Sequence, residues 1–456
     1  MKLIKNAKLI NEGEVFVASV LIKDDRISEI YNSAYSSLEG AEGGICPQEI
    51  LDKAEIIPAE GLWLLPGVID DQVHFREPGL THKGNIRSES RAAVAGGVTT
   101  FMDMPNTNPQ TTTIDELNRK FDKSAGNSFA NYTFFIGATN DNLPELKKSG
   151  TKRAAAVKVF MGSSTGNMLV NDESSLEKIF AEVDMLIATH CESESIIKQN
   201  IAHYTSLFGE NLDISFHPKI RSAEACYASS SEAVRLANKY NARLHLFHLS
   251  TAKEMTLLEN KALNDKKITG EVCVHHLWFS DEDYSEYGNL IKWNPSIKTV
   301  EDRTALRKAL NDGRLDVVAT DHAPHLLLEK QGSCLIAASG GPMVQHSLVA
   351  MLEMSRQGLW TPQTVVEKMC HAPAELFRIK DRGYIRKGYY ADLVLIDPKR
   401  TWKVSPENIL YKCGWSPLEK QTFSNAVVKT FVNGQLVYDN GIFDETARGK
   451  EVSFRT

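Results

Sequence analysis

Residues 64–79 read LLPGVIDDQVHFREPG, an apolar run that passes into a polar turn. The run has the length of a buried strand, and Pro78 and Gly79 are typical of a turn that follows one. His74 and Arg76 therefore stand where the strand ends. An imidazole and a guanidinium in this position suggest a metal that activates water beside a carboxylate-bearing substrate. The same pair is also compatible with a core-edge histidine and a surface arginine.

Seven further runs of apolar or β-branched residues follow, and segments with helical spacing separate most of them. The eight runs span residues 64–75, 99–104, 132–139, 154–161, 185–192, 244–250, 270–276 and 316–323. The helical segments span residues 87–95, 174–182, 230–241 and 301–311. Eight strands that alternate with helices predict an α/β fold of the (β/α)8 barrel type. A doubly wound open sheet is the alternative, but no GxGxxG follows the first strand and no P-loop is present.

The two ends of the chain have a different pattern from the middle. Residues 1–60 and 385–456 alternate polar and apolar residues, as strands do. Turn signals occur at Asn11-Glu12-Gly13, Asn433-Gly434 and Asn440-Gly441. We expect both ends to pair into one small β domain beside a barrel of residues 61–384. The stretch from Asn32 to Gln48, rich in Ser, Gly, Ala and Glu, is expected to be a surface loop.

Composition excludes several classes of protein. With a net charge of −6 over 456 residues, nothing favours binding to nucleic acid or to an anionic membrane. The 7 cysteines are scattered and form no CxxC pair, so a disulfide framework or a cysteine zinc site is not expected. No apolar run reaches the roughly 18 residues of a membrane span, and the N-terminus does not resemble a signal peptide. We expect a cytoplasmic protein.

Side chains that commonly bind metals recur at the predicted strand ends. In a (β/α)8 barrel these carboxyl-terminal ends meet at one face, where the active site lies. One such residue would mean little, but five on separate strands are difficult to explain as core filling. They are His74, Lys158, His190, His248 and Asp321.

Lys158 is the most informative of the five, because Ala, Val, Val and Phe surround it in AVKVF. A charged and unpaired lysine buried there would cost several kcal/mol. An ion pair inside the barrel mouth would remove this cost. A lowered pKa and reaction with carbon dioxide, which gives a carbamate able to bridge two metal ions, would also remove it. Residue types alone favour the ion pair.

Several motifs together resemble a known family. They are PGVID, HFREPG, MPNTNP, KVFMGSSTG, THCE, FHLST and ATDHAPH. These motifs resemble the amidohydrolase superfamily, and their combination is similar to the longer, bacterial-type branch of the dihydroorotase family. The pair ATDHAPH and HFREPG is highly specific, whereas THCE or FHLST alone is weak. GYYADLVLID and WSPLEKQTF extend the resemblance over essentially the whole chain.

The resemblance implies a zinc centre with one or two ions. His74 and Asp321 would bind one zinc, and His190 and His248 the other. Carbon dioxide would be present as the carbamate of Lys158, bridging the two ions. The resemblance therefore favours the carbamate over the ion pair, although an aspartate replaces this lysine in some relatives of the branch.

One residue departs from the family pattern. The family normally has His-x-His on the first strand, but the first position here is Gln72. A glutamine oxygen is a weaker ligand than an imidazole, which puts a full two-metal centre in doubt. Strand alternation places the neighbouring Asp71 on the opposite face from Gln72, so Asp71 is not expected to compensate.

The resemblance also implies a reaction and a substrate. The enzyme would interconvert dihydroorotate and N-carbamoyl-aspartate in pyrimidine biosynthesis, by attack of metal-bound hydroxide on the ring amide. Asp321 would carry the proton from the attacking water to the leaving nitrogen. Arg76, Asn106 and His325 would hold the substrate carboxylate, and Asn294 would contact the ring amide. The resemblance is compatible with a homodimer, which the sequence does not itself indicate.

Two other functions stay open. An allantoinase or hydantoinase would act on a related cyclic amide, but its substrate lacks the ring carboxylate that Arg76 would bind. A catalytically silent subunit that supports a partner enzyme is favoured only by Gln72. Two glycine-containing loops, residues 162–166 and 340–342, are expected near the pocket mouth.

Overall fold

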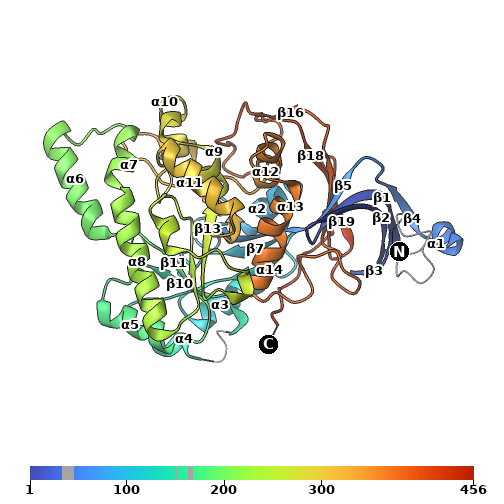
Figure 1. The fold of residues 1–456 in the computed structure, drawn as a ribbon, viewed down its shortest axis with the longest axis horizontal. Coiled ribbons are helices and arrows are strands. Elements are labelled where there is room, and N and C mark those ends of the chain that lie inside the picture. Colours follow the sequence, from blue (N-terminus) through green and yellow to red (C-terminus); the bar gives the residue numbers. More distant parts are fainter. Residues whose placement is uncertain (33–45, 149–151, 163–167, 456) are drawn as a thin grey trace.

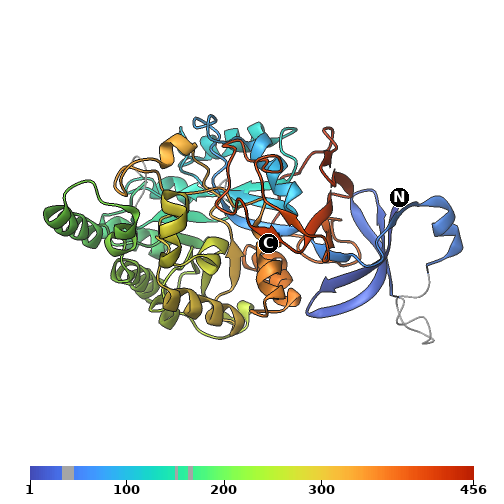
Figure 2. The same ribbon diagram turned by 90° about the horizontal axis from the view of Figure 1, so that it is seen from above.

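The computed structural model describes residues 1–32, 46–148, 152–162 and 168–455. Most of the loop expected from Asn32 to Gln48, and most of the loop expected at residues 162–166, lie outside these ranges. The molecule is elongated, with a helix-covered barrel at one end and a strand-rich lobe at the other (Figure 1). Figure 2, turned by 90°, shows the N-terminal strands projecting from the same end of the barrel.

Parallel strands form the barrel, as the sequence predicts. They form a three-stranded sheet, β6-β7-β8, and a six-stranded sheet, β9 to β14. A parallel bridge between Val73 and His322 joins the first and last strands and so closes the ring. The strands are β6 (Val68–Val73), β7 (Val98–Asp103), β8 (Asn131–Phe134), β9 (Ile136–Gly137), β10 (Val157–Phe160), β11 (Ile187–His190), β12 (Leu244–Leu246), β13 (Ile268–Cys273) and β14 (Val317–Ala319).

Helices connect these strands and cover the barrel. Local capping explains where several begin; for example, the Asn85 side chain accepts the Ser88 backbone N–H at the start of α2. The predicted helical segments correspond to α2, α5, the second half of α8, and α11. The helices are α1 (Gln48–Lys53), α2 (Ile86–Ala95), α3 (Ile114–Ser124), α4 (Leu143–Leu146), α5 (Glu173–Glu182), α6 (Glu194–Phe208), α7 (His217–Ile220), α8 (Ala223–Tyr240), α9 (Val274–Trp278), α10 (Tyr284–Tyr287), α11 (Val300–Asn311), α12 (Ser347–Arg356), α13 (Pro362–Val366) and α14 (Ala372–Leu376).

Strands from both chain ends form one nine-stranded sheet, which confirms the predicted β domain. Its order is β20-β19-β18-β15-β5-β1-β2-β3, with β4 beside β1. In Figure 1 the blue N-terminal strands lie beside the red C-terminal ones. Its members are β1 (Lys2–Asn11), β2 (Glu14–Lys23), β3 (Arg26–Asn32), β4 (Glu55–Pro58), β5 (Trp63–Pro66), β15 (Leu393–Asp397), β18 (Ala426–Val432), β19 (Gln435–Asp439) and β20 (Ile442–Phe443). A separate ribbon pairs β16 (Trp402–Lys403) with β17 (Thr422–Phe423).

The predicted turns of this sheet have the expected backbone. Asn433 and Gly434, between β18 and β19, both have positive φ, at 50° and 75°. Asn440 and Gly441, between β19 and β20, have φ of 48° and 95°. Consecutive positive φ values characterise the two-residue turns that match the twist of a hairpin. The exact boundaries at residues 61 and 385 remain a prediction.

Most of the predicted strands are shorter than expected, and two of them show why. The run 64–75 divides at Gly67, because β5 pairs with β1 and β15 in the end sheet whereas β6 belongs to the barrel. A Cβ at Gly67 would lie 2.0 Å from Oγ1 of Thr99, so only glycine fits this close crossing. The run 270–276 also ends early, at Cys273, and His275 and His276 lie in the first turn of α9.

In the described part of the chain, no helix combines the length and apolarity that crossing a membrane requires.

Candidate active site

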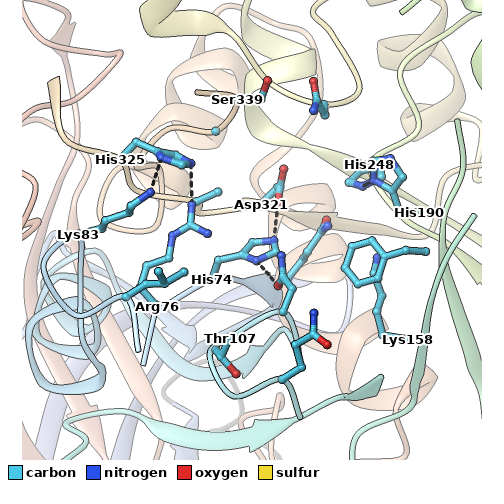
Figure 3. A pocket seen from close by; sticks show the side chains of 18 of the residues that line it. His74, Arg76, Lys83, Thr107, Lys158, His190, His248, Asp321, His325 and Ser339 are labelled. Atoms are coloured by element: carbon cyan, nitrogen blue, oxygen red, sulfur yellow. Dashed lines mark hydrogen bonds and ion pairs between the residues drawn. The ribbon is translucent and has the colours of Figure 1, made fainter. Parts of the chain in front are cut away.

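One cavity of about 750 Å³ lies at the carboxyl ends of the barrel strands. All nine residues that the sequence nominates line it, together with Gln72. Figure 3 shows His190, His248 and Lys158 on one side, Arg76, Lys83 and His325 on the other, and His74 and Asp321 between them. The nine are His74, Arg76, Asn106, Lys158, His190, His248, Asn294, Asp321 and His325. Their placement is a finding, while their chemical roles remain predictions.

Two histidines present ring nitrogens to one another at one side of this cavity. Nδ1 of His190 lies 2.9 Å from Nε2 of His248. The other nitrogen of His190, Nε2, lies 3.0 Å from a carboxylate oxygen of Glu192. A carboxylate accepts only, so Nε2 carries the proton and Nδ1 is left with a free lone pair. Such a carboxylate partner is what orients histidine ligands in metal sites.

Glu192 is held ionised in spite of its burial. Burial raises the pKa of its carboxyl, but the guanidinium of Arg221 and the contact with His190 outweigh burial and lower the pKa to about 2. The Arg221 guanidinium lies 2.5 Å from Oε2 of Glu192. Glu192 therefore keeps its acceptor oxygen toward His190 at every pH at which the enzyme would work.

His74 is oriented in a similar way from the middle of the cavity. Its Nδ1 lies 2.9 Å from Oδ1 of Asn106, and its Nε2 lies 3.1 Å from Oδ1 of Asp321. Both partners are acceptor oxygens; a metal bound between His74 and Asp321 would take the lone pair of Nε2, and the Asn106 oxygen would then accept the proton at Nδ1. Asn106 can therefore fix His74 through its oxygen while its amide nitrogen is available to a ligand.

Lys158 is buried without an ion pair or hydrogen bond. Only 1% of the residue is exposed, and Nζ has no hydrogen-bond partner among the described residues. Nζ lies 4.8 Å and 4.1 Å from the ring centroids of Phe160 and Phe247. Burial lowers the pKa of Lys158 to about 7, although the charges of Glu271 and Asp321 partly oppose this. A substantial neutral fraction therefore exists at neutral pH, and a neutral amine is the form that reacts with carbon dioxide.

Three site residues adopt a left-handed backbone that non-glycine residues rarely adopt. The φ angles are 68° at Arg76, 38° at His248 and 42° at Asp321. Such conformations cost about 1–3 kcal/mol each and persist only where the surrounding structure imposes them. Their coincidence at one cavity is typical of a functional site.

The residues fit a divalent metal such as zinc. Nδ1 of His190 offers a lone pair, and the cavity is also lined by His74, His248, Asp321 and Lys158, whose Nζ has no partner in the described structure. Imidazole nitrogens and carboxylate oxygens are the ligands that zinc takes. Gln72 lines the same cavity, with Oε1 3.7 Å from Sγ of Cys273. A glutamine oxygen adds only a weak ligand to this set.

The opposite side of the cavity carries groups that can bind an anion. Nε of Arg76 donates to the Pro324 carbonyl at 3.0 Å, which fixes the guanidinium, and Nη2 lies 3.0 Å from Nε2 of His325. Asn294 reaches the cavity with a buried Oδ1 that has no hydrogen-bond partner in the described structure. That oxygen is free to accept an N–H from a ring amide.

Alternation predicts that Asp71 and Gln72 lie on opposite faces, but both reach the interior, while the expectation that Asp71 does not compensate for Gln72 in the cavity agrees with the structure. Oδ2 of Asp71 lies 3.4 Å from Nε2 of His245, on a strand across the barrel, and Oε2 of Glu271 lies 3.9 Å from the same nitrogen. The pairing of β6 with β7 shifts between Asp70 and Val73. Such an irregularity interrupts alternation, so Asp71 and Gln72 both reach the interior. Asp71 approaches His245 and Glu271, however, and does not line the cavity.

The sequence analysis did not nominate Lys83 or Glu192. Lys83 lines the cavity, and its Nζ lies 3.1 Å from Nδ1 of His325. A second cation seven residues after Arg76 in the same loop was the available signal. Glu192 stands two residues after His190, a spacing at which a carboxylate can reach the ring of a ligand histidine.

Comparison with known proteins identifies the family. Residues 63–437 match the amidohydrolase family. The dihydroorotase of Methanosarcina acetivorans is 32% identical over 430 residues, which cover 91% of this chain and 87% of that protein. The dihydroorotase of Carboxydothermus hydrogenoformans is 32% identical over 444 residues, which cover 96% and 97%.

Solved structures show the same fold. An L-hydantoinase (dihydropyrimidinase) from Arthrobacter aurescens superposes with a TM-score of 0.89 at 24% identity, covering 99% of both chains. A dihydropyrimidinase from Brevibacillus agri superposes with a TM-score of 0.88 at 23% identity, covering 100% of this chain and 99% of that one. The family is generally metal-dependent, in agreement with the imidazole and carboxylate groups that line the cavity. From this match over most of its length, the chain belongs to the amidohydrolase family.

Proposed function

We propose that the protein is a zinc-dependent dihydroorotase, which interconverts dihydroorotate and N-carbamoyl-aspartate in pyrimidine biosynthesis. The observation that carries the proposal is the pairing of two sites in one cavity: metal-type donors on one side and the Arg76–His325 pair on the other. Relatives that cover most of the chain bear the same name.

The metal would be held by His74, His190, His248 and Asp321, with Lys158 joining them as its carbamate. Bound there, zinc would act as a Lewis acid and lower the pKa of water to about 7. Glu192 and Asn106 would keep the ring nitrogens of His190 and His74 in the tautomers that leave a lone pair toward the cavity.

Arg76 would bind the ring carboxylate of dihydroorotate, because its planar fork matches two carboxylate oxygens. The amide nitrogen of Asn106 and a ring nitrogen of His325 would complete this clamp. The free Oδ1 of Asn294 would accept an N–H of the ring. These contacts would orient the ring so that its amide carbonyl faces His74 and Asp321.

Asp321 would move the proton. Its carboxylate would accept a proton from the attacking water and return it to the ring nitrogen that leaves. The left-handed backbone at Asp321 supports this role, since it holds the side chain at the cavity, where the residue is only 6% exposed.

The proposal includes a cytoplasmic location and a homodimer. Seven unpaired cysteines, five of them buried, suit a reducing compartment. Leu328 and Ile336, exposed by 75% and 78%, offer apolar surface that a second copy would cover. Light scattering on the purified protein tests the dimer.

The direct test is turnover of dihydroorotate by the purified protein, with chelator and then with zinc and bicarbonate added back. We expect activity that the chelator removes and zinc restores. Hydantoin and allantoin serve as comparison substrates, because both lack the ring carboxylate that Arg76 would bind. Faster turnover of either would favour the hydantoinase-type alternative, and inactivity toward all three would favour the silent subunit.

A further inference from the structure

His325 lies between two cationic side chains. Its Nε2 is 3.0 Å from Nη2 of Arg76, and its Nδ1 is 3.1 Å from Nζ of Lys83. Figure 3 shows both contacts on the same side of the cavity. Burial lowers the pKa of His325, and the charges of Arg76 and Lys83 lower it further, so the ring is neutral.

A neutral imidazole cannot accept a hydrogen bond at both nitrogens, because one of them carries the proton. Arg76 and Lys83 can only donate, so just one of the two contacts can be a hydrogen bond to the neutral ring; in the first of the two arrangements, Nε2 accepts from Arg76. Nδ1 then carries the proton and faces Oε2 of Glu329 at 3.4 Å. Lys83 binds Oε1 of the same carboxylate at 2.7 Å. In this arrangement Lys83 and the His325 N–H share Glu329.

A bound carboxylate requires the other tautomer. Carboxylate oxygens only accept, so His325 can hold one beside Arg76 only if Nε2 carries the proton. Nδ1 must then accept a hydrogen bond, and the ammonium of Lys83 is the donor in reach. We propose that Lys83 is a positioning residue that fixes His325 as the Nε2–H tautomer when a ring carboxylate binds. This role rests on the proposed function.

Glu329 should act in the opposite direction. Its side chain is 30% exposed, and the Leu326 N–H holds its Oε2 at 2.8 Å. By attracting the proton at Nδ1, it favours the tautomer that cannot hold a carboxylate. If the ion pair between Lys83 and Glu329 were merely structural, loss of either residue should change KM in the same direction. The tautomer role predicts that the two losses change KM in opposite directions.

Steady-state kinetics with dihydroorotate on the zinc-loaded protein tests this difference. For Lys83→Met we expect KM to rise at least about tenfold while kcat changes less than about threefold, because a charge-assisted hydrogen bond to the clamp is lost. For Glu329→Gln we expect KM to stay unchanged or to fall. Lys239→Met is the matched control, since it breaks an exposed Lys–Glu pair of the same 2.7 Å length with Glu177 on α5. Equal rises in KM for both site variants would overturn the proposal.

A spectroscopic measurement reads the tautomer directly. Nitrogen NMR of histidine-labelled protein with bound orotate, a flat ring carboxylate, distinguishes Nδ1–H from Nε2–H, and His325→Gln identifies the signal. We expect Nε2–H in the parent protein and its loss in Lys83→Met. Nδ1–H in the orotate-bound parent would overturn the proposal. Because orotate binding needs no turnover, failure of the parent protein to hydrolyse dihydroorotate would count against the proposed function alone.

Discussion

Oδ2 of Asp71 lies 3.4 Å from Nε2 of His245, and the two residues meet across the interior of the barrel. Glu271 approaches the same nitrogen at 3.9 Å and accepts the backbone N–H of His248 at 3.0 Å. Burial lowers the pKa of His245, but contacts with Asp71 and Glu271 outweigh burial and raise the pKa to about 9. A protonated His245 therefore balances two buried carboxylates directly beneath the active site.

This arrangement makes stability depend on pH. The folded pKa of His245 lies above its unfolded value of about 6.5, so its contribution is complete below that pH and is lost as pH rises through 9. His245 by itself should cost up to about 3 kcal/mol of unfolding free energy between pH 6 and 9, while Lys158, whose folded pKa of about 7 lies below its unfolded value, acts in the opposite direction over this range. Asp71→Asn should reduce this loss to about half or less, because it removes a carboxylate that keeps His245 charged.

Thermal unfolding at a series of pH values checks this prediction. Asp122→Asn on the exposed side of α3 is the control, and it should leave the pH dependence as in the parent. An Asp71→Asn variant with the same pH dependence as the parent would contradict the account.

Restoring the histidine of the family pattern should tighten metal binding. Gln72 lines the cavity but offers only an amide oxygen, held near Sγ of Cys273. Gln72→His adds an imidazole beside His74, so we expect zinc affinity at the weaker site to rise at least about tenfold. Competition with a chelator measures the affinity, and Gln72→Glu tests whether negative charge alone gives the same gain. No change in metal content or affinity would show that residue 72 does not reach the ion.

Replacing Arg76 should affect binding of the ring carboxylate more than the chemical step. Arg76→Lys keeps the charge but loses the planar fork, so we expect KM for dihydroorotate to rise about tenfold to a hundredfold. The circular dichroism spectrum and metal content should match those of the parent. An unchanged KM would show that the ring carboxylate does not bind at this side of the cavity.

Lys158 should control assembly of the metal centre. Its pKa of about 7 means that pH 8 gives about tenfold more neutral amine than pH 6. Metal-free protein supplied with zinc and a fixed concentration of dissolved carbon dioxide should therefore regain activity faster at pH 8. Lys158→Met should hold less zinc and should not respond to carbon dioxide. Recovery of the parent without carbon dioxide would contradict the carbamate.

The position of the site could be predicted from the sequence because the geometry of a barrel brings its strand ends to one face. Any polar residue that ends a barrel strand reaches the same face, so His74, His190 and His248 could be brought together without coordinates. The end sheet was predictable as well, since polar and apolar residues alternate at both chain ends and turn signals separate the alternating runs.

Features set by packing could not be predicted. Strand alternation predicted Asp71 and Gln72 on opposite faces, but the irregular pairing of β6 with β7, which no local pattern encodes, lets both reach the interior. The run 64–75 gave no sign of dividing between two sheets, because the division depends on a close crossing of Gly67 over Thr99. Lys83 was missed because its approach to His325 depends on the loop after Arg76, whose left-handed backbone is imposed by tertiary contacts.

The sheet built from both chain ends has a consequence for synthesis on the ribosome. β5 pairs with β1 soon after both emerge, but its other neighbour, β15, is made more than 300 residues later. Until then β5 has an open edge of unpaired backbone groups, which is prone to pairing with other chains. The edge of β5 therefore stays open to misassociation until β15 is made, and a chain truncated before Leu393 would lack the strand that covers it.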